Sequence, residues 1–269
     1  MRQIGREQDL ERINRTALQL AKEVAEKTNT LFAGGVSQTN IYVEGDEKSE
    51  AAVRAMYLEQ VQWAKEEGAE YIICETLSYL REAEIALEVV KSFGLPAVVT
   101  FAIPAQSAAE EELKTLDSVP LQTACRKLLD QGATLVGTNC FRGPNGTLEV
   151  VKQILKECPP EKVCALPVAF RTTKEEPTFF DFTDKECAEN NPVYPHGLEA
   201  FFVSPSEITK FTKECMELGL KYVGICCGNS GNYTRAMAEA MGRLPPASRY
   251  HNPTCMGINP VARKEELHQ

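Results

Sequence analysis

Long apolar runs are missing from this sequence of 269 residues. The longest, at residues 95–105, is far shorter than the roughly 20 apolar residues that span a bilayer. The sequence therefore predicts no membrane segment. The first residues are polar and lack the apolar core of a secretory signal, so we expect a cytoplasmic protein.

Positive charge and histidine are also scarce. Lys and Arg number 29 against 38 Asp and Glu, which gives a net charge of -9. Nucleic-acid binding depends on a basic surface that displaces phosphate counterions, so no nucleic acid is expected as a partner. The only three histidines, His196, His251 and His268, fall in predicted loop or tail segments and are interpreted as surface residues, not as zinc ligands.

Cysteine, by contrast, is abundant, with ten residues. In a reducing cytosol most of them should be free thiols, because disulfides are rare there. Free cysteine packs as a small hydrophobic residue. We interpret seven of the ten as packing or surface thiols: Cys74, Cys125, Cys158, Cys164, Cys187, Cys215 and Cys255.

Helical and strand patterns alternate along the chain. Amphipathic periodicity predicts helices at 7–27, 48–67, 81–93, 120–132, 146–157, 206–218 and 230–242. Short apolar runs predict strands at 31–36, 71–75, 97–102, 134–140, 163–169 and 222–227. We expect the first strand to break at Gly34-Gly35, and Asp117 or Ser118 to cap the helix that begins near Pro120. Residues 170–205, rich in proline and aromatics, predict a long irregular loop.

Apolar strands that alternate with helices specify a parallel sheet covered by helices. The length suits an α/β fold of the TIM type, a (β/α)8 barrel, although only about six of its eight strand-helix units are recognisable. Six strands leave two open edges with unpaired backbone groups. We therefore expect one barrel domain over residues 1–245, incomplete at its N-terminus, a tail at 246–269, and a homo-oligomer that covers the open edges.

Three cysteines stand at the ends of predicted strands: Cys140, and the adjacent pair Cys226 and Cys227. Functional groups of parallel α/β folds gather at the carboxyl ends of strands. Neighbouring residues in a strand point to opposite faces, so the pair can share one ion only where the strand ends, and Gly228 supplies that break. Three thiolates leave one tetrahedral position on zinc open, which is typical of a catalytic site.

A zinc-bound thiol is deprotonated, whereas a free thiol near pKa ~8.5 is mostly neutral at pH 7. The predicted chemistry is attack by a zinc-bound substrate thiolate on an electrophilic carbon. Two other interpretations stay open: small residues packed at a strand end, and a redox pair, although adjacent cysteines would form a strained disulfide. The aromatic residues Trp63, Tyr79, Phe179, Phe180 and Phe182 are interpreted as packing groups and not as a ligand cage.

Five stretches of the chain resemble the homocysteine S-methyltransferase family, and most closely its betaine-homocysteine branch. They lie at residues 33–39, 137–140, 197–199, 224–228 and 244–248, and the separated Asn-Cys and Cys-Cys-Gly motifs are the most specific. The resemblance implies a barrel in which Cys140, Cys226 and Cys227 hold Zn²⁺. It also implies that a small onium donor methylates the zinc-bound thiol of homocysteine, which gives methionine.

The resemblance further implies that Glu75 binds the amino group of homocysteine, and it adds four substrate-binding residues: Thr76, Gly34, Gln38 and Asn139. The family's first two strands, with an Asp-Gly-Gly motif and donor-contacting aromatics, have no match, so the chain is expected to begin after the second strand. Thr76 replaces a tyrosine of the betaine branch. Aromatic faces hold quaternary ammonium groups, so this change leaves sulfonium donors such as S-methylmethionine open beside betaine. The alternative is a catalytically inactive zinc-binding or interaction protein that retains a partial barrel.

Overall fold

The computed structural model describes residue 1 and residues 4–104, 112–184, 191–228 and 231–250. Helices and strands alternate along them. The helices are α1 (Leu10–Thr28), α2 (Glu47–Glu67), α3 (Leu80–Ser92), α4 (Leu121–Asp130), α5 (Pro144–Ile154), α6 (Pro205–Glu217) and α7 (Gly231–Ala240). The strands are β1 (Ala33–Ser37), β2 (Tyr71–Leu77), β3 (Ala97–Phe101), β4 (Leu135–Asn139), β5 (Val163–Leu166) and β6 (Tyr222–Val223). No helix among the described residues has the length and apolar character needed to cross a membrane.

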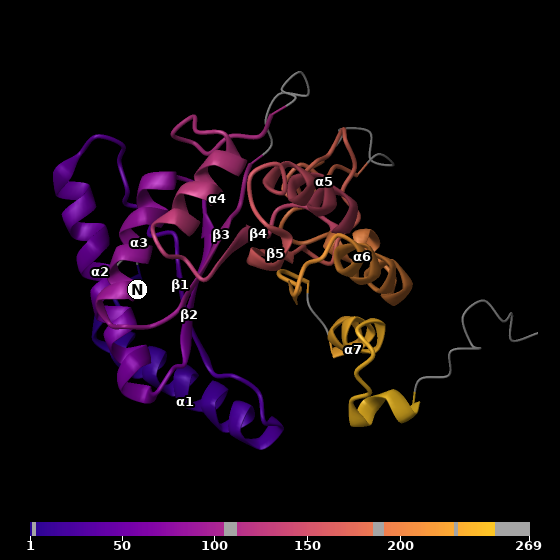
Figure 1. Cartoon of the computed structure of the whole chain (residues 1–269), viewed down its shortest axis with the longest axis horizontal. Coiled ribbons are helices and arrows are strands. Elements are labelled where there is room, and N and C mark those ends of the chain that lie inside the picture. Colours follow the sequence, from indigo (N-terminus) through magenta and orange to yellow (C-terminus); the bar gives the residue numbers. More distant parts are fainter. Residues whose placement is uncertain (2–3, 105–111, 185–190, 229–230, 251–269) are drawn as a thin grey trace, which may run out of the picture.

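All strands belong to one six-stranded parallel sheet in the order β1-β2-β3-β4-β5-β6. Each strand pairs with the next one along the chain, so every right-handed crossover places its helix on the same face of the sheet. Figure 1 shows the helices as an arc around the strands, with α1 and α7 at its two ends. This winding is that of a TIM-type barrel wall, not of a doubly wound sheet with helices on both faces. The predicted fold class, with six recognisable units, is confirmed.

The sheet has an outer face against the helices and a concave inner face. Outer positions such as Ile72, Val99 and Val136 are buried in the main core with the helices. Side chains from the two distant strands β2 and β6 meet over the inner face. Burial, and then a hydrogen bond with Tyr71 of β2, raise the pKa of Tyr222 in β6. Contact between these strands means that the sheet curls like a segment of a barrel.

Strand β1 differs from its prediction, because it runs through both glycines instead of breaking at them. Gly34 pairs with Ile72 of β2, and the ladder continues to Ser37 opposite Glu75. A Cβ on Gly34 would lie 2.7 Å from the Cβ of Ala64 in α2 and 2.8 Å from the Cδ1 of Ile72. The glycine therefore permits close packing of helix on strand, where the sequence suggested a turn.

The predicted cap of α4 is also wrong. The carboxylate of Asp117 accepts hydrogen bonds from the backbone N–H groups of Leu80 and Arg81, at 2.9 and 3.1 Å, and so caps α3. Helix α4 begins after Pro120 with no side-chain cap. Asp117 lies far from α3 in the sequence and close to α4. Local sequence patterns alone therefore predict that it caps α4.

The last two strands are shorter than predicted. Strand β5 ends at Leu166, because Pro167 has no N–H to continue the ladder. Beyond Val223 the chain still follows β5 through separate hydrogen bonds, such as that from the Gly224 N–H to the Ala165 carbonyl at 3.1 Å. The irregular segment after β5 returns to the sheet at an isolated bridge between Phe170 and Phe202. Its long, irregular character is as predicted, with residues 185–190 outside the described part.

Helix α6 starts from a capping box that carries a pH-dependent contribution to stability. Ser204 and Glu207 exchange side-chain to backbone hydrogen bonds, and Arg171 binds Glu207 through two nitrogens at 3.0 and 2.7 Å. The hydrogen bonds with Arg171 lower the pKa of Glu207 to about 2. A carboxyl whose pKa is lowered by folding stabilises the folded state above its unfolded pKa, and that contribution is lost as the pH falls toward 2.

Glu207→Gln is expected to lower the free energy of unfolding by about 0.5–1 kcal/mol at pH 7, because the pair is partly exposed and screened. The difference from the unsubstituted chain should shrink as the pH is lowered from about 4.5 toward 2. Urea unfolding at several pH values measures it. Glu214→Gln removes only a loose i,i+4 pair with Lys210 in the same helix and serves as the control. An equal effect of Glu207→Gln at pH 7 and pH 3 would contradict the assignment.

Candidate metal centre

Cys140 directly follows β4 in an unusual backbone conformation. Its N–H still donates to the Leu166 carbonyl of β5 at 3.0 Å, so the residue is anchored to the sheet. Cys140 and Phe141 then both have positive φ angles, of 61° and 58°. Two successive left-handed residues turn the chain sharply away from the strand direction. The Cys140 side chain is thereby buried at the carboxyl end of the sheet.

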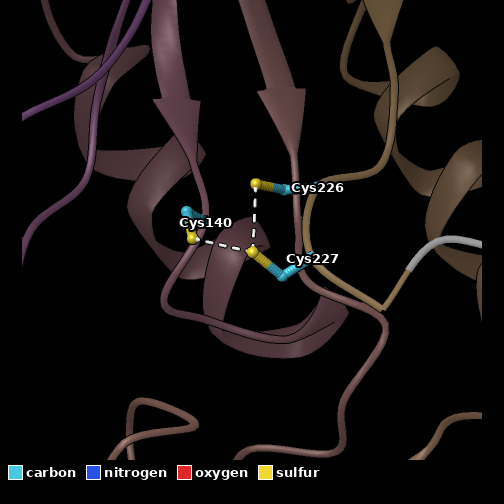
Figure 2. Close-up of side chains that lie close together, drawn as sticks. All are labelled: Cys140, Cys226 and Cys227. Atoms are coloured by element: carbon cyan, nitrogen blue, oxygen red, sulfur yellow. Dashed lines mark hydrogen bonds between the residues drawn. The ribbon is translucent and has the colours of Figure 1, made fainter. Parts of the chain in front are cut away.

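Cys226 and Cys227 are held at the same end by the neighbouring chain segment. The Cys226 N–H donates to the Pro167 carbonyl at 2.7 Å, and the Cys227 carbonyl accepts from the Ala169 N–H at 2.9 Å. Gly228 follows with a φ of 78°, so the chain breaks direction where the sequence predicted. Because the strand has ended, both sulfurs can lie on the side of Cys140, as Figure 2 shows.

Gly228→Ala is expected to lower the free energy of unfolding by roughly 1–3 kcal/mol, because a side chain at positive φ is strained. A Cβ there would also lie 2.9 Å from the Cζ of Phe170. Thermal unfolding measures the loss, and zinc titration should show weaker binding through the displaced Cys227. Gly231→Ala is the control, because its Cβ would meet nothing within 4 Å. Equal stability of the two variants would refute the argument.

The three sulfurs form a compact triangle. The Sγ atoms of Cys140 and Cys227 are 3.7 Å apart, those of Cys226 and Cys227 are 3.9 Å apart, and all three lie within 4.8 Å of one another. A disulfide would need about 2.05 Å. Two thiolates on one tetrahedral zinc, each at about 2.3 Å, are separated by roughly 3.8 Å. The donor set and its spacing therefore fit a zinc ion with a fourth position left for another ligand.

Hydrogen bonds among the three thiols shift their pKa values apart and favour the ionised form of Cys227. Hydrogen bonds from Cys140 and then Cys226 lower the pKa of Cys227 to about 3. Hydrogen bonds with Cys226 and then Cys227 raise the pKa of Cys140. Cys140 is buried, Cys226 half-buried and Cys227 exposed. The cluster is thus reached from solvent on the side of Cys227.

Glu75 lies on the inner face, near the sulfurs. Burial, and then electrostatic repulsion from the neighbouring Cys226, raise the pKa of this half-buried carboxyl group. Within the described part of the chain, its carboxylate has neither a hydrogen bond nor an ion pair. A carboxylate that is partly desolvated and unpartnered is suited to bind a cationic group of a ligand.

Thr76 and Asn139 meet directly beside Glu75. The Thr76 N–H donates to the Asn139 Oδ1 at 2.8 Å, and the Asn139 Nδ2 donates to the Thr76 Oγ1 at 2.8 Å. Thr76 has a φ of 60°, and the pairing of β2 with β3 shifts register between Cys74 and Leu77. No sequence pattern predicts this bend, because the partner that holds Thr76 lies on another strand.

The two remaining predicted substrate residues lie on or beside β1. Gln38 follows this strand, and its Oε1 is 3.5 Å from the Oγ of Ser78, which follows β2. Gly34 packs against α2 on the outer face, opposite to the face that carries Glu75. The close packing against α2 explains why a glycine is needed at position 34. The assignment of Gly34 to substrate binding stays a prediction.

Aromatic rings from the segment after β5 cover the buried side of the cysteines. Cys140 belongs to one packed cluster with Phe170, Phe179 and Phe182. Phe179 and Phe182 are 5% and 1% exposed, so they serve as packing groups, as predicted. Phe180 is 40% exposed and lies at the edge of this cluster. Its ring centroid is 4.7 Å from that of Tyr194.

The fold and site together define a class: a singly wound parallel α/β protein with a cluster of three thiols at the carboxyl ends of its strands. A family model described as homocysteine S-methyltransferase matches residues 1–241. The chain belongs to the homocysteine S-methyltransferase family. This membership confirms the resemblance drawn from the Asn-Cys and Cys-Cys-Gly motifs.

Curated relatives agree with this membership. The chain is 30% identical over 257 residues to betaine–homocysteine S-methyltransferase 1 of Mus musculus, and 32% identical over 249 residues to S-methylmethionine–homocysteine S-methyltransferase BHMT2 of Pongo abelii. These matches cover 93% and 90% of this chain, but the chain spans only 59% and 64% of those relatives.

The apo crystal structure of the homocysteine methyltransferase MmuM from Escherichia coli shares the fold, with a TM-score of 0.62 at 15% identity. That match covers 86% of this chain and 73% of the other.

Proposed function

We propose that the protein transfers a methyl group from a small onium donor to the thiol of homocysteine in a zinc-dependent reaction that yields methionine. The observation that carries this proposal is the sulfur triangle of Cys140, Cys226 and Cys227, whose spacing fits zinc and leaves a position for a substrate thiol. When bound, zinc would keep that substrate thiol ionised at neutral pH.

The protein's own side chains would select the acceptor. Glu75 is partly desolvated and has no partner in the described chain, so its carboxylate would bind the α-amino group of homocysteine. The short thiol chain of the same substrate could then reach the metal.

The methyl donor would be a small onium compound. The names of the relatives in mouse and orangutan specify betaine and S-methylmethionine. Both donors carry a methyl group on a positively charged atom, which leaves as a neutral amine or sulfide. Thr76 offers no aromatic face for a quaternary ammonium group, so we propose a sulfonium such as S-methylmethionine in preference to betaine.

A reducing compartment such as the cytoplasm would suit this site, since the cysteines of the described residues are free thiols. A homo-oligomer would suit the sheet, because within the described residues β1 and β6 each pair on one side only. The open sheet also favours the alternative, an inactive zinc-binding or interaction protein that retains a partial barrel.

The decisive experiment loads the purified chain with zinc and measures methionine formed from L-homocysteine with betaine, S-methylmethionine and dimethylsulfoniopropionate in parallel. We expect one zinc per chain and methionine from a sulfonium donor. Cysteine offered in place of homocysteine is the control acceptor. Stoichiometric zinc without methionine from any donor would favour the inactive alternative, and absence of zinc binding would overturn both.

A further inference from the structure

Asn139 is a buried polar residue whose side chain connects three strands and a metal ligand. It is 1% exposed and ends β4 on the inner face of the sheet. Its Oδ1 accepts hydrogen bonds from the Thr76 N–H and the Thr100 Oγ1, both at 2.8 Å. Its Nδ2 donates to the Thr76 Oγ1 at 2.8 Å and lies 3.8 Å from the Cys226 Sγ.

These contacts leave the amide without free capacity for a substrate. A side-chain amide offers two acceptor sites on its oxygen and two hydrogens on its nitrogen. Thr76 and Thr100 use the oxygen, and Thr76 and Cys226 use the nitrogen. The role of Asn139 is therefore to hold protein groups, which differs from the substrate contact expected from the sequence.

The group that Asn139 holds is under backbone strain. Threonine is β-branched and rarely adopts a positive φ, yet Thr76 has a φ of 60°. Such a conformation persists only where the surroundings fix it. The register shift between Cys74 and Leu77 marks a bulge in β2, and bulges re-aim the side chains that they carry. Glu75 lies within this bulge.

We infer that Asn139 is a positioning residue that ties the Glu75–Thr76 bulge to the Cys226 sulfur, and so sets the amino-group site at a fixed place relative to the metal ligands. This inference rests on the proposed function and deepens it. Its consequence is selective: losing the tie should weaken the binding of a thiol that carries an amino group more than the binding of a plain thiol.

The test compares Asn139→Ala with Thr138→Val. Thr138 is the adjacent buried residue, and its hydroxyl donates to the Phe101 carbonyl at 3.0 Å, so the control also removes one buried hydrogen bond from β4. Each protein is loaded with Co²⁺, and the absorption of the cobalt–thiolate centre is followed during titration with L-homocysteine and, separately, 1-propanethiol. Amide hydrogen exchange at Thr76 is measured on the same proteins by NMR.

For Asn139→Ala we expect a Kd for L-homocysteine roughly tenfold higher or more, which corresponds to about 1.4 kcal/mol of lost binding to the displaced Glu75. The Kd for 1-propanethiol should change by less than about twofold, and exchange at Thr76 should accelerate. Thr138→Val should leave all three unchanged. Equal weakening of both thiols, or unchanged exchange at Thr76, would overturn the inference.

Failure of the proposed function would be visible separately. An unsubstituted protein whose cobalt spectrum responds to neither thiol would overturn the function before any variant is compared. Hydrogen exchange at Thr76 would still decide whether Asn139 holds the bulge, because that measurement needs neither metal nor substrate.

Discussion

Replacing Cys227 with serine is expected to weaken zinc binding by more than about a hundredfold and to abolish methyl transfer. Loss of an outer-shell group already costs 10- to 100-fold in metal affinity, and a direct ligand should cost more. Serine does not ionise at neutral pH, so two thiolates would remain where the 3.7 Å and 3.9 Å sulfur separations provide three. Zinc per chain, measured by competition with a chromogenic chelator, and methionine formation are the readouts.

The control for this substitution is Cys158→Ser. Cys158 is also a free cysteine, but it is buried and donates to the Gln122 carbonyl far from the sulfur triangle. Serine is close in size to cysteine, and this position lies before β5 at the opposite end of the strands, so zinc content and activity should persist. Full metal retention in Cys227→Ser would rule out the three-thiol centre.

Glu75→Gln is expected to raise the KM for L-homocysteine by roughly ten- to hundredfold, with zinc content unchanged. The substitution preserves shape and removes the charge, and a hydrogen bond to a charged group is worth about 1.5–3 kcal/mol. Glu75 has no other partner in the described chain, so little else should change. Initial-rate kinetics over a range of homocysteine concentrations separates KM from kcat.

Glu161→Gln is the control for Glu75→Gln, because it makes the same chemical change at an exposed carboxyl group. Glu161 precedes β5 and lies at the opposite end of the strands. Its kinetics should equal those of the unsubstituted protein. A Glu75→Gln protein with an unaltered KM would show that the amino group of the substrate binds elsewhere. Loss of zinc in that variant would instead assign Glu75 a structural role.

The strand-helix alternation and the three cysteines were predictable because both are local or simple features. Apolar runs and amphipathic periods mark the elements directly, and Cys140, Cys226 and Cys227 stand where strands must end. Parallel strands bring such ends together, so the clustering of the three thiols follows from topology. The homologous relatives confirm the family that these motifs indicated.

What the sequence did not reveal depends on partners distant in the chain. The bend at Thr76 exists because Asn139, on another strand, binds both its N–H and its hydroxyl. Asp117 caps α3, although it lies next to α4 in sequence. Residue patterns report what a segment prefers by itself, and these features are set by tertiary hydrogen bonds instead.

The contact between Tyr71 and Tyr222 has a consequence for ligand capture. Tyr71 precedes Glu75 by four positions, and Tyr222 precedes Cys226 by four positions. Tyr71 and Glu75 share the inner face, because side chains four apart in a strand point the same way. The tyrosine pair therefore links the strand that carries the carboxylate to the segment that continues into Cys226. A link between these two parts of the sheet would lower the entropic penalty of rearrangement when an amino thiol docks across them.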